Sequence, residues 1–436
     1  MTVLIKNGRV LDPSQNLDKI CNILIKEDRI AEIFDSEKLV AAPDGAERRA
    51  DTVIDADGCF VMPGLIDLHV HLREPGFEYK ETVRTGSMAA ARGGFTTICP
   101  MPNTSPVTDT PQKIEALLKK AAEVSPVNIC PVGAVTIGQQ GEELTNIAGM
   151  AGAGALAISE DGKSVMNAKV YRQAMEEAAR SGIVVMAHCE DRNLVGKGAL
   201  NAGAAAERLG VDGITNAVED VIVARDIVLA AETGARLHLC HCSTKGSTVI
   251  LKAAKKEGIA VTGEVCPHHF ALTEDDIKED DANYKMNPPL RTREDVKALK
   301  EALRDDVMDV ISTDHAPHSA EEKAKPIKDA PFGIVGLETA VALTVTHLLA
   351  EGYLTPLKMA AKMSTNPAKV LGIDKGTLKV GKIADITIIN PDEEYVIDKT
   401  AFASKGKNTP FDGKKVRGRV KYTIVSGRVV YQSENI

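Results

Sequence analysis

The chain has 436 residues, of which 44% are hydrophobic and 26% are charged, and its formal net charge at pH 7 is −8. This composition excludes an intrinsically disordered protein, and the negative net charge argues against a nucleic-acid-binding surface. Because the length exceeds that of a typical single domain, we expect either one large domain with a small accessory domain or two domains of equal size.

The sequence gives no sign of a targeting segment or a membrane span. A charge at Lys6 and a turn at Asn7-Gly8 interrupt the first residues, which therefore cannot form the apolar core of a secretory signal. No run approaches the roughly 18 apolar residues that a membrane span needs. The eight cysteines form no Cys-x-x-Cys pair of a structural zinc site. We therefore expect a cytoplasmic protein with buried, reduced thiols.

Both ends of the chain predict short β-strands joined by turns. Near the N-terminus, Asn7-Gly8 lies between two apolar runs and indicates a β-hairpin. The other strands expected in the two ends lie at residues 20–25, 29–33, 385–389, 416–425 and 428–430. Because neither end has enough strands to bury a face by itself, we expect residues 1–60 and 371–436 to form one small β-sandwich together.

The middle of the chain, residues 61–370, alternates apolar strand-like runs with helical patterns. The eight runs lie at residues 65–70, 95–99, 127–132, 154–158, 183–186, 236–240, 259–263 and 307–311. Helices are expected after the cap and first-turn proline at Thr110-Pro111 and at residues 171–180, 218–232, 247–257 and 294–303. Eight strands alternating with helices over this length predict an α/β fold, a closed (β/α)8 TIM barrel.

A doubly wound open sheet is the alternative fold for this region. Such a sheet usually brings a glycine-rich phosphate-binding loop. Gly162-Lys163-Ser164 resembles half of that loop, but Ala157 stands where the loop requires its first glycine. The barrel is therefore the preferred prediction.

The motif Asp67-Leu68-His69-Val70-His71 lies at the end of the first barrel strand. Side chains alternate across a strand, so His69 and His71 point to the same side, toward the barrel axis. Two imidazoles spaced in this way can chelate one metal ion.

Metal-binding residue types also follow four other strands. Asp161 follows the fourth strand, His188 the fifth, His241 the sixth and Asp314 the eighth. Packing does not explain them, because barrel enzymes carry their active sites at the carboxyl ends of the strands. With the two histidines of the first strand they suffice for two zinc ions, a bridging carboxylate and an open position for hydroxide. A single catalytic metal is the alternative.

The remaining histidines favour structural roles. His238 is expected in the core because it lies three residues before His241, on the opposite side of the strand, and His347 lies in an apolar helical run. His268 and His269 follow the seventh strand, so one of them is a candidate for a role just behind the metal ligands.

Five motifs in this order resemble those of dihydroorotases, which are members of the amidohydrolase superfamily. They lie at residues 63–76, 101–104, 187–191, 266–269 and 312–318, the last followed by Lys323. The similarity covers nearly the whole chain, including both β-rich ends. Each motif alone occurs across the superfamily, but the set is typical of the long bacterial type of dihydroorotase.

The resemblance implies a role for each matching residue. The zinc ligands would be His69, His71, His188, His241, the bridging Asp161, and Asp314, which is also the catalytic residue. The substrate would be bound by His71, Arg73, Asn103, Asn287, His318 and the backbone of Phe332 and Gly333. Many relatives bridge the zinc ions with a carboxylated lysine, so Lys163 is the alternative bridge. Ser312 departs from the usual Gly or Ala, but it is also small.

The implied activity is the zinc-dependent, reversible cyclisation of N-carbamoyl-L-aspartate to (S)-dihydroorotate plus water, in pyrimidine (UMP) biosynthesis. In this interpretation Asp314 moves a proton between the zinc-activated hydroxide and the ring nitrogen. The guanidinium fork of Arg73, together with Asn103, suits a carboxylate-bearing ring. The polar residues 318–333 predict a loop over the barrel mouth, and its closure on substrate is a hypothesis.

Two other functions stay open at this point. One is a related cyclic-amide hydrolase, such as an allantoinase or a hydantoinase. The other is a catalytically silent scaffold for aspartate transcarbamoylase, against which the complete set of metal ligands argues. A homodimer and an association with aspartate transcarbamoylase are the protein partners considered, and the sequence decides neither.

Overall fold

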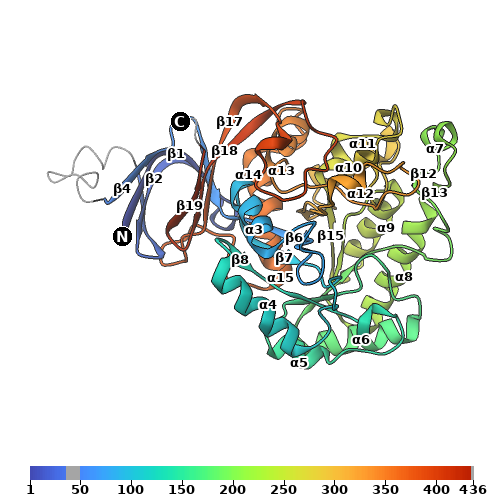
Figure 1. The fold of residues 1–436 in the computed structure, drawn as a ribbon. Helices are drawn as coiled ribbons and strands as arrows, with labels where there is room; N and C mark the ends of the chain where they lie inside the picture. The colour runs from blue at the N-terminus through green and yellow to red at the C-terminus, as the bar shows by residue number, and fades with distance from the viewer. Residues whose placement is uncertain (36–49, 434–436) are drawn as a thin grey trace.

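The computed structural model describes residues 1–35 and 50–433. It contains a barrel of parallel strands surrounded by helices and, beside it, a curled sheet built from both ends of the chain (Figure 1). Residues 36–49, which belong to the predicted N-terminal β-rich part, lie outside the described residues. No helix in the described parts is long and apolar enough to cross a membrane.

The barrel strands follow one another around the barrel in chain order. They are β6 (Leu65–Val70), β7 (Phe95–Pro100), β8 (Asn128–Ile129), β9 (Val132–Ala134), β10 (Ala157–Ser159), β11 (Val184–Ala187), β14 (Leu237–Leu239), β15 (Val261–Val265) and β16 (Val310–Ile311). The predicted third strand is split, because β8 pairs with β7 and β9 pairs with β10. A parallel bridge between Val70 and His315 closes the ring, and the His71 N–H donates to the His315 carbonyl at 2.8 Å. The predicted (β/α)8 barrel is confirmed.

The longer helices on the outside of the barrel lie where the sequence patterns predicted them, except the first, Val83–Arg92, which no pattern predicted. The longer ones are α3 (Val83–Arg92), α4 (Pro111–Val124), α6 (Ala168–Ser181), α8 (Ala217–Thr233), α9 (Lys245–Lys256) and α11 (Arg293–Arg304). The Thr110 side chain caps α4 by accepting from the Lys113 N–H, and Pro111 occupies its first turn.

Short helices fill the connections. They are α5 (Ile147–Gly152), α7 (Ala204–Leu209), α10 (Pro267–Ala271), α12 (Ala320–Lys323), α13 (Ala340–Thr344), α14 (Pro356–Ala360) and α15 (Asn366–Leu371), with π-helical turns at Val345–Leu349 and Ala361–Thr365 and 3-10 turns at Pro13–Gln15, Ile137–Gln139, Glu274–Asp276, Ala282–Tyr284 and Lys399–Ala401. A small two-stranded sheet, β12 (Leu200–Asn201) with β13 (Gly213–Ile214), lies between α6 and α8 in the chain. The predicted loop at residues 318–333 contains α12.

The second sheet joins the two ends of the chain. Its strands are β1 (Thr2–Asp12), β2 (Leu17–Lys26), β3 (Arg29–Phe34), β4 (Thr52–Asp55), β5 (Phe60–Pro63), β17 (Ile386–Val396), β18 (Lys415–Val425) and β19 (Arg428–Gln432). The order is β19-β18-β17-β5-β1-β2-β3, with β4 beside β1. Ile23, Ile386 and Ile424 belong to one apolar core that residues of both ends share. The prediction that the two ends form one β-unit around a shared core is confirmed, and its strands make one continuous sheet where the two sheets of a β-sandwich were expected.

The hairpin predicted at Asn7-Gly8 is wrong. β1 runs through this point and pairs with β2 from Thr2 to Asp12, with a bulge where Asn7 adopts a φ of 62°. The glycine serves close packing instead, because a Cβ at Gly8 would lie 2.4 Å from the Val61 side chain. The chain reverses after Asp12, around the 3-10 turn Pro13–Gln15.

Candidate metal centre

Six side chains converge at the carboxyl ends of the barrel strands. Asp161 stands in the middle of the group: its carboxylate oxygens lie 3.2 Å from Nε2 of His69, 3.6 Å from Nε2 of His71, 3.6 Å from Nδ1 of His188 and 3.7 Å from Nε2 of His241. Oδ1 of Asp314 lies 3.1 Å from Nε2 of His71. The structure therefore brings together every residue that the sequence proposed as a metal ligand.

The spacing of these donor atoms fits bound cations. Ligand atoms at about 2.0–2.1 Å from a tetrahedral zinc ion stand about 3.3 Å from one another, and Nδ1 of His188 lies 3.0 Å from Nε2 of His241. Two groups have donor atoms within 4.8 Å of one another: His69 with His71 and Asp314, and His69 with Asp161 and His241. The residues present thus fit a metal pair.

Unsatisfied polar atoms point to the same conclusion. Among the described residues, both ring nitrogens of His69 are buried without a hydrogen-bond partner of suitable geometry. Buried polar atoms in proteins nearly always have partners, so such orphans need an explanation. A cation next to the Asp161 carboxylate would satisfy the Nε2 atom of His69.

Both carboxylates are ready to bind a cation. Burial by itself would raise the pKa of Asp161, but His69, His188 and His241 hold this pKa well below its usual value. Burial acts in the same direction on Asp314, yet the hydrogen bond with His71 and the nearby His69 lower the pKa of Asp314 to about 2. Both groups are therefore anionic at neutral pH, as metal coordination requires.

Glu264, which no sequence pattern singled out, lies in β15 behind the ligands. Its Oε1 lies 3.4 Å from Nδ1 of His69 and accepts from the His241 backbone N–H at 3.2 Å. Its Oε2 lies 3.0 Å from Nε2 of His238, which is fully buried, as predicted. Because Nδ1 of His69 faces Glu264, Nε2 of the same ring is directed toward Asp161. In the sequence, Glu264 could have been noticed as a carboxylate that directly follows the apolar run at residues 259–263.

Asp67 was also missed. It joins the first barrel strand to the segment that follows the last one. Its Oδ1 accepts the backbone N–H groups of His69 and Thr313, each at 3.1 Å. Burial raises the pKa of Asp67 to about 7 despite these hydrogen bonds. This side chain therefore holds the first histidine motif against the segment that carries Asp314.

Most of the proposed substrate contacts line one cavity next to these ligands. Its volume is about 160 Å³, and its wall includes His71, Arg73, Asn103, Asn287, Phe332 and Gly333. Asn103 donates to Asp161 at 3.0 Å and lies 2.9 Å from Nδ1 of His71, so it also orients two ligands. Asn287 donates to Glu190 at 2.5 Å.

His318 lies just behind this wall. Its Nε2 must carry the ring proton, because it lies 2.8 Å from the Phe332 carbonyl, which can only accept. Nη2 of Arg73 lies 3.3 Å from this protonated nitrogen and therefore does not donate to it. Burial, followed by the charges of Arg73 and Lys80, lowers the pKa of His318 to about 3. His318 is thus neutral and leaves the end of the Arg73 fork for a ligand.

Lys163 lies away from the centre of the ligand group. Its Nζ donates to the Gln139 carbonyl at 3.1 Å. Asp161, in contrast, has carboxylate oxygens within 3.7 Å of all four ligand histidines. The geometry favours Asp161 as the bridging residue.

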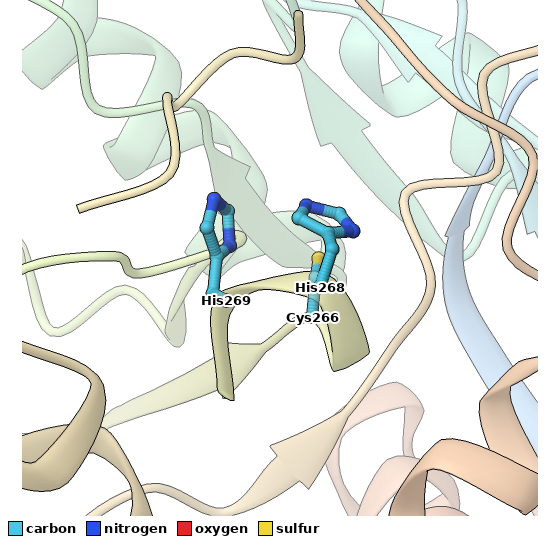
Figure 2. A group of neighbouring side chains, drawn as sticks. All are labelled: Cys266, His268 and His269. Carbon is cyan, nitrogen blue, oxygen red and sulfur yellow. The ribbon is translucent and has the colours of Figure 1, made fainter. Parts of the chain in front are cut away.

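His268 and His269 lie on α10, next to Cys266 (Figure 2). The two imidazole rings stand side by side with centroids 4.2 Å apart, and the donor atoms of the three residues lie within 4.8 Å of one another. Nε2 of His269 donates to the Pro288 carbonyl at 2.9 Å. His269 therefore holds the segment that carries Asn287.

Comparison with known proteins identifies the family. Residues 58–247 match the family described as Dihydro-orotase-like. The chain is 50% identical over 436 residues to a dihydroorotase of Pelotomaculum thermopropionicum, covering 100% of both chains, and 48% identical over 432 residues to one of Geobacter metallireducens, covering 99% of this chain and 100% of the other. The chain belongs to the dihydroorotase family. The predicted resemblance is confirmed.

The solved structures that resemble this dihydroorotase-family chain include hydantoinases. An L-hydantoinase from Arthrobacter aurescens superimposes with a TM-score of 0.88 at 29% sequence identity, covering 100% of this chain and 97% of the other. A D-hydantoinase from Thermus sp. gives a TM-score of 0.83 at 27% identity, covering 99% and 95%. The fold is therefore common to enzymes with different cyclic-amide substrates, and the site has to explain specificity.

Proposed function

We propose that the chain catalyses the reversible cyclisation of N-carbamoyl-L-aspartate to (S)-dihydroorotate in pyrimidine biosynthesis. The observation that carries this proposal is the convergence of four imidazoles and two carboxylates beside a cavity lined by Arg73. Relatives named dihydroorotase, with 46–50% identity over essentially the whole chain, support it. Residues 61–370 would carry the active site, and residues 1–60 and 371–436 would form the accessory unit.

The proposed cofactor is a pair of zinc ions. His69, His71 and Asp314 would hold one ion and His188 and His241 the other, with Asp161 between them. When bound, such ions act as Lewis acids on a carbonyl oxygen and lower the pKa of water from 15.7 to about 7. All of the proposed donor atoms are nitrogen or oxygen, and both these atom types and their spacing suit zinc.

Asp314 is the proposed proton carrier. It is an anionic carboxylate at the edge of the cavity, with Oδ1 3.1 Å from His71. In the hydrolytic direction it accepts the proton of the attacking water as the water adds to the ring carbonyl. It then donates this proton to the ring nitrogen as the carbon–nitrogen bond breaks. Cyclisation uses the same steps in reverse order.

Arg73 is the proposed specificity residue. Its Nε donates to the Pro317 carbonyl at 3.2 Å, which fixes the plane of the guanidinium and leaves its terminal N–H groups for the substrate carboxylate. Asn103, Asn287 and the backbone of Phe332 and Gly333 would bind the rest of the substrate. Hydantoin hydrolysis is the second candidate because of the structural similarity to hydantoinases, but a hydantoin lacks the carboxylate that Arg73 suits.

Turnover of N-carbamoyl-L-aspartate before and after treatment with a chelator, followed by zinc addition, tests this proposal. We expect activity that the chelator removes and zinc restores. Hydantoin and allantoin serve as comparison substrates, and preferential turnover of either would contradict the assignment.

A further inference from the structure

Two stretches of chain that carry proposed substrate contacts run side by side at the barrel mouth. One contains Pro317 and His318, and the other contains Phe332 and Gly333. They are joined by a parallel bridge between His315 and Ile334, and the Ala316 N–H donates to the Ile334 carbonyl at 2.8 Å. Beyond this bridge neither stretch continues as a strand, so other groups have to fix the distance between them.

Asn408 joins the two stretches through one side chain. Its Oδ1 accepts the His318 N–H at 3.0 Å, and its Nδ2 donates to the carbonyls of Ala316 at 3.1 Å and Gly333 at 3.0 Å. Its own carbonyl accepts the Val335 N–H at 2.9 Å. The side chain is 5% exposed. Its acceptor and both of its donor hydrogens are therefore used at the wall of the cavity.

Asn408 does not belong to the barrel. It lies in residues 402–409, which we call the strap, within the connection between β17 and β18 of the terminal sheet. The strap is anchored on the barrel, because the Ala403 N–H donates to Glu338 at 2.8 Å and the Ser404 hydroxyl donates to Glu81 at 2.6 Å. Gly406 lets it approach closely, since a Cβ there would lie 2.6 Å from Pro317 Cβ.

Lys323 also supports this wall. Its buried Nζ donates to the carbonyls of Gly333 at 2.9 Å, Pro331 at 3.1 Å and Lys285 at 3.2 Å. The Gly333 carbonyl thus receives hydrogen bonds from both Lys323 and Asn408. Two fixed donors on one carbonyl set the orientation of its peptide plane.

We propose that Asn408 is a positioning residue for substrate binding, through which the terminal sheet shapes the carboxylate end of the active site. This inference rests on the proposed function. Asn408 fixes Ala316, His318 and Gly333. Pro317 lies between the first two of these residues, and its carbonyl holds Arg73. Loss of the Asn408 amide displaces these groups together and weakens substrate binding more than the proton transfer at Asp314.

The test uses Asn408→Ala and Asn408→Asp in the full-length, zinc-loaded protein. Asn408→Asp has nearly the same shape and keeps the acceptor for His318, but it loses both donors and places a carboxylate against two carbonyls. Lys405→Ala is the matched control, because Lys405 lies in the strap but is exposed and reaches outward to the Glu78 carbonyl. Zinc content and circular dichroism are measured for each variant.

We expect both Asn408 variants to lose kcat/KM for N-carbamoyl-L-aspartate by about tenfold or more, equivalent to about 1.4 kcal/mol. The loss should appear mainly in KM, with zinc content unchanged and Lys405→Ala behaving as the wild type. In a His318→Ala background the effect of Asn408→Ala should become smaller, because residues that act through a shared contact are not additive.

Other outcomes overturn the inference. Wild-type kinetics in Asn408→Asp would do so, as would a loss confined to kcat or full additivity with His318→Ala. If Asn408→Ala does not fold, the nearly isosteric Asn408→Asp decides. Failure of the proposed function is distinguishable, because the zinc-loaded wild type would then not turn over N-carbamoyl-L-aspartate.

Discussion

Replacement of Arg73 by methionine separates substrate recognition from metal binding. Arg73 already adopts a φ of 61°, so methionine meets the same left-handed backbone and adds no new strain. Its length preserves the apolar contacts of the arginine stem. The change removes the guanidinium that lines the cavity and the hydrogen bond to the Pro317 carbonyl, while every proposed metal ligand is left in place.

The size of the effect follows from the loss of a hydrogen-bonded charge pair. Truncating one partner of such a pair at a binding site costs about 2–5 kcal/mol, which corresponds to about 30-fold to several thousand-fold. Arg73 is half-buried without substrate, so we expect the lower part of this range. Arg73→Lys keeps the charge but loses the fork, and its kcat/KM should lie between those of the wild type and Arg73→Met.

The assay is the loss of dihydroorotate absorbance, with kcat and KM determined at saturating zinc and metal content measured on the same samples. Arg304→Met is the matched control, because Arg304 is an exposed residue paired with the neighbouring Asp305. A kcat/KM of Arg73→Met within about threefold of wild type would refute the carboxylate-binding role. Loss of zinc from this variant would show that Arg73 acts on the metal centre instead.

Three further changes test other parts of the site. Asp314→Asn should lower kcat by about 10²–10⁴-fold, because proton transfer is lost, while the circular dichroism spectrum stays that of the folded protein; substantial remaining activity would contradict the role. Glu264→Gln should weaken metal binding by about 10–100-fold, measured by competition with a chromophoric chelator, since it removes the charge that orients His69; unchanged affinity would argue against that orientation. Burial raises the pKa of Glu338 to about 7 from 4.5. Between these two pH values Glu338 is protonated in the folded protein but ionised in the unfolded chain. The free energy of unfolding therefore falls as the pH rises through this range. Glu338→Gln removes this dependence, and its melting temperature should rise relative to wild type from pH 5 to pH 8; parallel curves would count against a buried, titrating Glu338.

The barrel and the metal ligands could both be predicted from one pattern, the series of apolar strand-like runs with metal-binding residue types at their ends. Five of the eight apolar runs end at a residue that reaches the metal site, so the positions of the strands themselves placed His188 after β11 and His241 after β14. Parallel strands in a closed barrel end on the same face. Residues far apart in the chain therefore meet without any further assumption.

The missed features depend on contacts that sequence spacing does not encode. Asn7-Gly8 has the composition of a turn, yet the packing of Val61 against Gly8 favours a bulge in a continuous strand. Glu264 looks like an interruption of an apolar strand, and only the position of His69 explains it. Asn408 lies 90 residues from His318 in sequence, and the contact depends on the path of the strap.

These differences divide the site into two parts with different origins. The metal ligands follow barrel strands, and a similar barrel occurs in hydantoinases at 29% identity or less. The groups proposed to recognise the carboxylate lie in irregular chain, and their hydrogen bonds lead to Lys323, to Asn408 and so to the terminal sheet. Loops without their own ladder of hydrogen bonds need such external support to keep a binding geometry. Changes of substrate within this fold should therefore involve the strap and the loop that it holds, whereas changes at the strand ends should affect the shared chemistry.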